Sequence, residues 1–185
     1  MKKIWLALKL MIVVSIIELP YQTIALNRAT TVAPVEIGGT FDLTDQEGHQ
    51  VTEQILKGKY SIVLFGFSRC PHVCPVQLSI LAKSLDASPK LQAIFITLDP
   101  KRDTVERLDE FSKSFHERIL MLTGTEEMIK KVVNDYKVYV EANEDPERFN
   151  HSTIMYLIGP DGNYVTHFTP RDEDELLAYI KEYAH

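Results

Sequence analysis

The sequence predicts an α/β domain in which a central mixed β-sheet is flanked by helices. Three continuous apolar runs, at residues 61–67, 94–98 and 153–158, are typical of strands that are covered on both faces. The stretch 76–87, between the first two runs, has its apolar residues at helical spacing. Asp161-Gly162 then marks a tight turn into a returning antiparallel strand. Parallel strand–helix–strand units closed by a β-hairpin follow from this order.

The first predicted elements of the domain are a hairpin and a buried strand. Residues 41–43 precede the turn residues 45–48, which predicts a hairpin at the N-terminal edge of the domain. The run 61–67 is the first buried strand, and the polar Ser68 follows it. The helix at 76–87 has apolar residues at positions 78, 80, 81 and 85, and the second buried strand follows at 94–98.

Capping signals predict the remaining helices. Asp103 with Glu106, and Thr123 with Glu126, have the spacing of an N-cap residue and its N3 partner. They predict helices at 103–115 and 123–136, separated by a short strand at 119–122. The third buried strand at 153–158 and a strand at 164–168 form the closing hairpin. Pro170 is predicted at the first position of a last helix that ends at Tyr183. This arrangement is typical of a thioredoxin-like fold with an N-terminal hairpin extension. Residues 141–150, which hold four acidic residues and a proline, read as a loop.

Length and composition are those of one ordinary globular domain with a short appendage. The chain has 185 residues, of which 45% are hydrophobic, and a formal net charge of -6 from 26 acidic and 20 basic side chains. A body of about 150 residues buries enough surface to fold without a metal or a disulfide. This charge balance argues against nucleic-acid binding, which needs a clustered basic face.

Residues 1–26 are predicted to be a targeting segment, and residues 27–185 the domain. Lys2 and Lys3 precede an apolar stretch, and Thr23-Ile24-Ala25 resembles a signal-peptidase site. The apolar stretch is shorter than the roughly 20 residues of a spanning helix. A cleaved signal peptide is therefore the first choice and an uncleaved N-terminal membrane anchor the second. Either one predicts export to the bacterial periplasm or cell envelope, with any membrane association confined to this segment.

The chemistry is expected at Cys70 and Cys74, the two cysteines of the chain. They lie between a buried strand and a helix predicted to begin near Pro75, and ligands collect at the carboxyl ends of strands in such sheets. The helix dipole is expected to favour thiolates and to lower the pKa of these cysteines. A spacing of four brings both side chains to one helix face, within the range of a shared metal ion or of a disulfide.

His151 favours the metal. Redox dithiols normally have two residues between their cysteines, whereas three intervene here. Thioredoxin-like oxidoreductases also place a proline directly before the strand that faces the dithiol, where this chain has Asn150-His151-Ser152. Two thiolates and an imidazole suit copper or zinc, and a structural zinc site would require a fourth ligand. His72 lies between the cysteines, where it either supplements the site or, as we expect, points away from it. The remaining histidines are expected on the solvated surface: His49, His116, His167 and His185.

Four motifs together resemble the Sco/SenC family of copper proteins that assist cytochrome c oxidase assembly. They are GFSRCPHVCP at 66–75, ITLDPKRDT at 96–104, LTGTEE at 122–127 and HSTIMYLIGPDG at 151–162. The resemblance implies that Cys70, Cys74 and His151 bind Cu(I) and Cu(II). The family commonly has Asp directly before the histidine, where this chain has Asn150, so the outer contact and the local charge at that position stay open.

The resemblance also implies the partners. A metallochaperone of this family delivers copper to the binuclear CuA centre in subunit II of cytochrome c oxidase, with other copper chaperones or thioredoxin-like reductants as further partners. The alternative function is a thiol–disulfide oxidoreductase that uses Cys70 and Cys74 to reduce cysteines of the oxidase subunit or of another envelope protein. A peroxide-reducing relative ranks last, because the Thr/Arg setting of a peroxidatic cysteine is not found.

Overall fold

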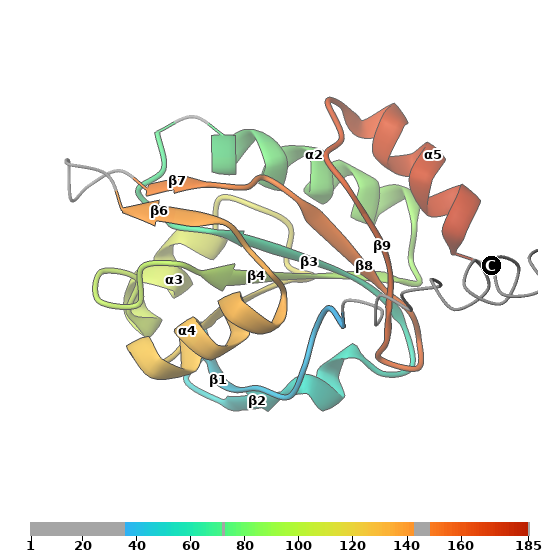
Figure 1. The fold of residues 1–185 in the computed structure, drawn as a ribbon. Helices are drawn as coiled ribbons and strands as arrows, with labels where there is room; N and C mark the ends of the chain where they lie inside the picture. Colours follow the sequence, from blue (N-terminus) through green and yellow to red (C-terminus); the bar gives the residue numbers. More distant parts are fainter. Residues whose placement is uncertain (1–35, 72, 143–148, 185) are drawn as a thin grey trace, which may run out of the picture. The chain divides into compact units, whose positions relative to one another are not determined.

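The fold is a mixed α/β domain built on one seven-stranded sheet (Figure 1). The computed structural model describes residues 36–71, 73–142 and 149–184, so the predicted targeting segment 1–26 lies outside the described residues. The sheet order is β2-β1-β5-β4-β3-β8-β9. The strands are β1 (Asp42–Asp45), β2 (Gln50–Thr52), β3 (Tyr60–Gly66), β4 (Leu91–Thr97), β5 (Ile119–Thr123), β8 (Met155–Ile158) and β9 (Tyr164–Phe168).

The pairing of these strands confirms the predicted thioredoxin-like class. β3, β4 and β5 are parallel, whereas β8 pairs antiparallel with β3 and with β9. The predicted N-terminal hairpin is β1–β2, and it extends the sheet by pairing β1 antiparallel with β5. The helices are η1 (Glu53–Leu56), α2 (Val73–Ala87), α3 (Val105–Ser112), α4 (Glu126–Asp135) and α5 (Glu173–Tyr183).

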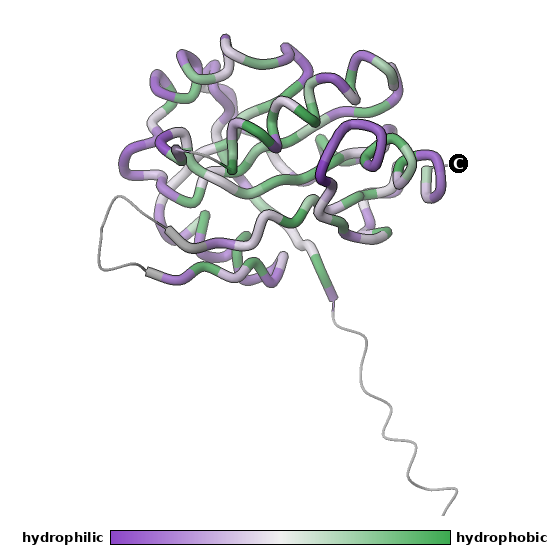
Figure 2. Tube along the Cα trace, turned by 90° about the horizontal axis from the view of Figure 1, so that it is seen from above, coloured by the Kyte–Doolittle hydropathy of each residue, from purple (hydrophilic) through white to green (hydrophobic). Residues whose placement is uncertain are grey.

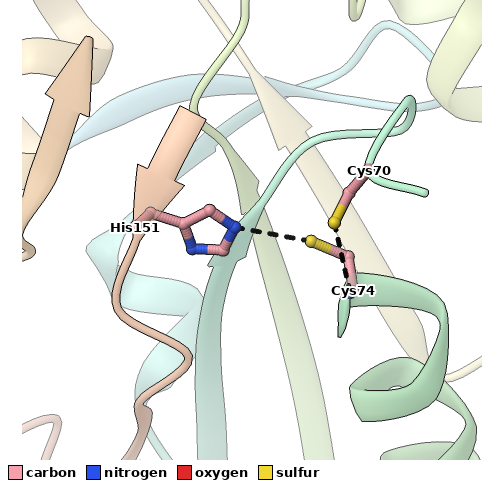
Figure 3. A group of neighbouring side chains, drawn as sticks. All are labelled: Cys70, Cys74 and His151. Atoms are coloured by element: carbon pink, nitrogen blue, oxygen red, sulfur yellow. Dashed lines mark hydrogen bonds between the residues drawn. The ribbon is translucent and has the colours of Figure 1, made fainter. Parts of the chain in front are cut away.

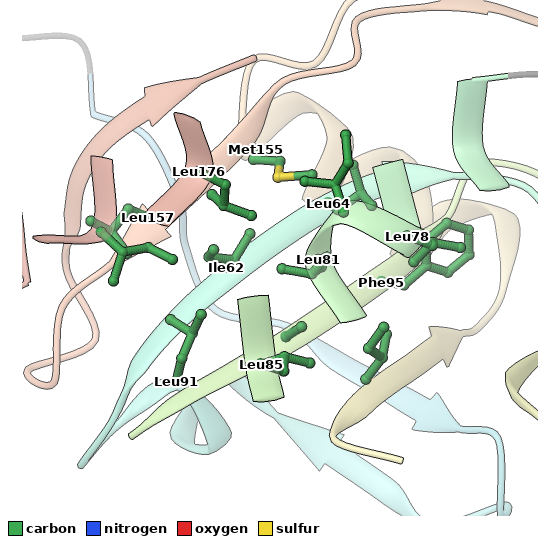
Figure 4. Close-up of a cluster of buried hydrophobic side chains, with 14 of the residues drawn as sticks. Ile62, Leu64, Leu78, Leu81, Leu85, Leu91, Phe95, Met155, Leu157 and Leu176 are labelled. Atoms are coloured by element: carbon green, nitrogen blue, oxygen red, sulfur yellow. The ribbon is translucent and has the colours of Figure 1, made fainter. Parts of the chain in front are cut away.

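Alternation along the central strands divides the core between the two faces of the sheet. Ile62 and Leu64 of β3 point to one face, and Val63 and Phe65 to the other, as the two-residue period of a strand requires. The first face packs against α2, α3 and α5 and the second against α4 and η1. Figure 4 shows the first cluster between β3, β4, β8 and the helices, and Figure 2 shows hydrophobic residues along the inner strands.

The helix boundaries differ from the predicted ones. Thr104, not Asp103, caps α3, because its side chain accepts a hydrogen bond from the backbone N of Arg107. Thr125, not Thr123, caps α4 in the same way. Asp103 is buried, and its carboxylate accepts a hydrogen bond from the hydroxyl of Thr97 at the end of β4. Both true caps lie outside the core, where a side-chain oxygen can turn back onto the first helical turn.

The last helix also begins later than predicted. Asp172 is its N-cap and accepts a hydrogen bond from the backbone N of Glu175, so α5 begins at Glu173 rather than at Pro170. Three acidic residues in the first turn complement the positive end of the helix dipole. Among the described residues, no helix combines the length and apolar character needed to cross a bilayer.

The predicted loop at 141–150 is wrong in part. A second, two-stranded antiparallel sheet forms from β6 (Val140–Ala142) and β7 (Phe149–His151). Its register pairs Val140 with His151. His151 therefore lies at the end of β7, and residues 152–154 connect it to β8 of the main sheet.

Candidate metal centre

The two cysteines lie at the carboxyl end of β3, where the chain turns into α2. Cys70 follows the strand by four residues, and its backbone N donates to the carbonyl of Phe67, 3.2 Å away. The helix begins at Val73, earlier than predicted, so Cys74 lies in its first turn. Both side chains are buried, and neither forms a disulfide. The backbone N of Cys74 donates a hydrogen bond to Cys70 Sγ at 3.4 Å. Amides in the first turn of a helix have no acceptor within the helix, so the sulfur of Cys70 provides one here.

The imidazole of His151 points toward this pair of sulfurs (Figure 3). A hydrogen bond within its own segment orients the ring. Its Nδ1 lies 2.9 Å from the carbonyl oxygen of Ser152. A carbonyl oxygen only accepts, so Nδ1 carries the proton and Nε2 of the neutral ring presents a lone pair. That Nε2 lies 3.6 Å from Cys74 Sγ. The ring of Phe67 meets the imidazole edge-on, with 5.8 Å between the ring centroids.

The three candidate donor atoms converge on one point. The sulfurs of Cys70 and Cys74 and a ring nitrogen of His151 all lie within 4.8 Å of one another. Metal–sulfur and metal–nitrogen bonds of about 2.0–2.3 Å place two ligands of one ion roughly 3.5–4 Å apart. Small side-chain movements therefore suffice to close this set around an ion, and two sulfurs with an imidazole suit a soft first-row metal.

The ionisation of Cys74 differs from the prediction. Helix α2 was expected to lower the pKa of the cysteines, but the pKa of the Cys74 thiol is raised well above its ordinary value. The hydrogen bond with the Cys70 side chain is the largest cause and burial the second; Asp103 adds a smaller like-charge effect. The dipole is outweighed because the second thiol and the dry surroundings both disfavour a negative charge on this sulfur. Metal binding at neutral pH must therefore displace a proton from Cys74.

Sequence reasoning missed a buried carboxylate beneath the cysteine turn. Asp103 is fully buried, and its carboxylate accepts hydrogen bonds from the backbone N and hydroxyl of Ser68, at 2.9 and 2.6 Å. It also accepts one from the hydroxyl of Thr97 at 2.6 Å. Arg107 Nε in turn donates to the Ser68 hydroxyl at 3.1 Å. This network ties the turn that leads to Cys70 to β4 and α3. The spacing of Asp103 and Glu106 predicts a helix cap, because a cap residue and its N3 partner give the same sequence signal.

The other histidines lie away from these side chains where the structure describes them. His49 is exposed in the β1–β2 turn, His116 contacts Asp86 at 3.2 Å, and His167 stacks on Tyr164 in β9. His72, His185 and the side chain of Asn150 lie outside the described residues.

Fold and site together define a thioredoxin-like domain with a two-cysteine, one-histidine site suited to a soft metal ion. A comparison with protein-family models matches residues 29–185 to SCO1/SenC. The chain belongs to the SCO1/SenC family.

The similar proteins include mitochondrial and bacterial members of the family. The chain is 44% identical over 160 residues to the mitochondrial protein SCO2 of Saccharomyces cerevisiae, covering 80% of this chain and 53% of that protein. It is 36% identical over 174 residues to the mitochondrial SCO1 homolog 1 of Arabidopsis thaliana, covering 87% and 52%. A SCO2-like protein of Rickettsia conorii is 38% identical over 156 residues, covering 77% and 76%. The chain thus spans about half the length of the two mitochondrial relatives.

Solved structures of the family share the fold. ScoI of Bradyrhizobium japonicum with copper bound is 37% identical, with a TM-score of 0.72, covering 80% of this chain and 99% of that one. Yeast Sco1 with copper bound is 37% identical, with a TM-score of 0.70, covering 80% and 87%.

Gly66, the last residue of β3, provides a test of how tightly the site is built. A Cβ at this position would lie 2.8 Å from Cys74 Sγ and 2.8 Å from a ring carbon of Phe95. Gly66→Ala is therefore expected to displace Cys74 and to lower the free energy of unfolding of the reduced protein by about 1–3 kcal/mol, the usual range for overpacking. Urea unfolding measures this change. An unchanged free energy of unfolding, with unchanged thiol reactivity, would show that the packing is looser than described.

Proposed function

We propose that this protein is a copper metallochaperone that binds Cu(I) and Cu(II) through Cys70, Cys74 and His151 and assists assembly of the CuA centre of cytochrome c oxidase. The observation that carries the proposal is the convergence of three soft or borderline donor atoms within 4.8 Å of one another. Membership of the SCO1/SenC family, and two family structures that hold copper, support it.

The chain's own residues suit a cargo that must be held and then released. The two sulfurs are buried at one strand–helix junction, and thiolates prefer Cu(I). His151 comes from a different segment, at the end of the short β6–β7 sheet. A ligand from a separate segment can leave while the two thiolates stay bound. Copper can then pass to a partner by stepwise exchange of ligands.

The partner and the location rest on the family resemblance. We propose subunit II of cytochrome c oxidase as the acceptor of copper, and other copper chaperones or thioredoxin-like reductants as further partners. Residues 1–26 are proposed to be a signal peptide, or an N-terminal anchor, that exports the domain at 27–185 to the bacterial periplasm. A solved SCO1/SenC family lipoprotein of Bacillus anthracis, 26% identical to this chain, supports an envelope location. The mass of the intact mature protein distinguishes a cleaved signal peptide from an uncleaved anchor.

A thiol–disulfide oxidoreductase is the second candidate function. The sulfurs of Cys70 and Cys74 lie within 4.8 Å of one another, so a disulfide between them requires the two side chains to move closer. His151 would have little part in this chemistry. The role of His151 therefore separates the two functions.

Copper titration of the reduced protein under anaerobic conditions tests the first function. We expect one copper ion per chain, with Cys70→Ser and Cys74→Ser each abolishing the thiolate-to-Cu(II) charge-transfer band. His151→Ala should weaken Cu(II) binding by a factor of at least about 100, because a ligand rather than an outer contact is lost.

His49→Ala is the matched control, because His49 is an exposed histidine in the β1–β2 turn. Its copper affinity should equal that of the wild type. Equal Cu(II) affinity in the wild type and His151→Ala, together with reduction of insulin disulfides by both, would overturn the metal-carrier function in favour of the oxidoreductase.

The pH dependence of copper binding follows from the raised pKa of Cys74. At neutral pH this thiol holds its proton, so copper must release it, and the affinity should rise with pH. Each proton released changes the binding constant about tenfold per pH unit. Competition titrations with Cu(I) between about pH 6 and about pH 8 measure the slope. An affinity that does not change over this range would mean that no thiol proton is displaced.

A further inference from the structure

Gln77 of α2 has a buried side-chain oxygen with no described partner beside the candidate metal centre. Within the described part of the chain, two buried side-chain oxygen or nitrogen atoms lack a hydrogen-bond partner, Gln77 Oε1 and Ser152 Oγ. Gln77 follows Cys74 by three residues on the same helix, and Ser152 directly follows His151. Buried polar groups are nearly always satisfied, so two orphans at one site call for a functional explanation.

The orientation of the Gln77 amide is fixed by its other end. Its Nε2 donates to the backbone carbonyl of Pro170 at 3.3 Å. The reverse assignment would place two oxygen atoms against each other, so Oε1 is the atom that lacks a partner. The side chain is only 7% exposed, and an unpaired amide oxygen in such a place costs roughly 1–3 kcal/mol.

The free oxygen belongs to a residue that lines the same pocket as two of the candidate ligands. Cys74, Gln77, His151 and Thr153 line this pocket together with apolar side chains of β3 and α2. The pocket leaves no room for a water-sized sphere between these side chains. An entering ion that draws these side chains together would give the oxygen a positive partner.

We propose that Gln77 Oε1 is a weak fourth donor to copper that acts on Cu(II) and not on Cu(I). This inference rests on the proposed copper function of Cys70, Cys74 and His151. Copper sites with three strong nitrogen and sulfur ligands accept a long, weak fourth ligand, and the amide oxygen of glutamine is one such donor. Cu(II) is harder than Cu(I) and prefers higher coordination numbers, so an oxygen donor favours the oxidised ion.

Two substitutions of similar size separate this role from a structural one. Gln77→Leu removes both the oxygen and the hydrogen bond to Pro170. Gln77→Glu loses the same hydrogen bond at neutral pH but keeps an oxygen donor with a negative charge. If only the bond to Pro170 mattered, the two variants would behave alike.

The experiment measures Cu(II) and Cu(I) affinities and the Cu(II) electron paramagnetic resonance spectrum of the wild type and both variants. Gln77→Leu should weaken Cu(II) binding about tenfold and leave Cu(I) binding unchanged, which raises the reduction potential of bound copper by about 59 mV. Gln77→Glu should bind Cu(II) at least as tightly as the wild type. The copper hyperfine splitting should differ between the two variants. Circular dichroism and thermal unfolding verify that each variant is folded.

The outcomes distinguish this inference from the function on which it rests. If the wild type binds one copper ion but Gln77→Leu has the same spectrum and affinity ratio, Gln77 is not a donor and the metallochaperone proposal stands. Equal shifts in Gln77→Leu and Gln77→Glu would also overturn the donor role, since the loss of the Pro170 bond explains them. If the wild type itself binds no copper, both proposals fail together.

Discussion

The close approach of two buried sulfurs at the end of β3 is the constraint on which the rest of the site depends. The strand brings Gly66 so near to Cys74 that a side chain at this position would collide with the sulfur. The helix that follows begins at Val73, so its first turn carries Cys74 and directs a backbone amide at Cys70 Sγ. The neighbouring Cys70 thiol and burial raise the pKa of Cys74, so this thiol keeps its proton at neutral pH. Binding of a soft metal ion and formation of a disulfide are the two reactions that remove thiol protons from such a pair.

Two further segments complete this junction from opposite sides. The carboxylate of Asp103 accepts hydrogen bonds from Ser68, in the turn before Cys70, and from Thr97 of β4. This buried side chain therefore connects the turn to the sheet. On the other side, the β6–β7 sheet holds the backbone around His151, with the backbone N of Ser152 donating to the carbonyl of Tyr139 at 3.1 Å. The Nδ1 contact then turns the lone pair of Nε2 toward Cys74. A buried pair of sulfurs and an imidazole from a separate segment suit the proposed carriage of a soft ion.

Much of this was predictable from the sequence because buried strands and paired cysteines give strong local signals. The apolar runs that form β3, β4 and β8 predict the observed sheet. The spacing of Cys70 and Cys74 and the position of His151 single out three side chains that the structure brings within 4.8 Å of one another. What failed depends on contacts between distant segments. Asp103 and Thr123 have the spacing of helix caps, but neither caps a helix. The carboxylate of Asp103 accepts hydrogen bonds from the hydroxyls of Ser68 and Thr97. The hydroxyl of Thr123 donates to the backbone carbonyl of Asp103. The prediction of a lowered pKa is wrong for Cys74, because a helix dipole can be inferred from the local sequence, whereas burial and contact with the second thiol cannot.

X-ray absorption spectroscopy of the Cu(I)-loaded protein tests the central claim most directly, because it reports the atoms bonded to copper. The account predicts two sulfur neighbours and one nitrogen neighbour, with distances of about 2.2–2.3 Å and about 2.0 Å by analogy with other first-row ions. In His151→Ala the nitrogen contribution should vanish while both sulfurs stay. A copper ion with one sulfur or none, or an unchanged nitrogen contribution in His151→Ala, would contradict the three-residue site.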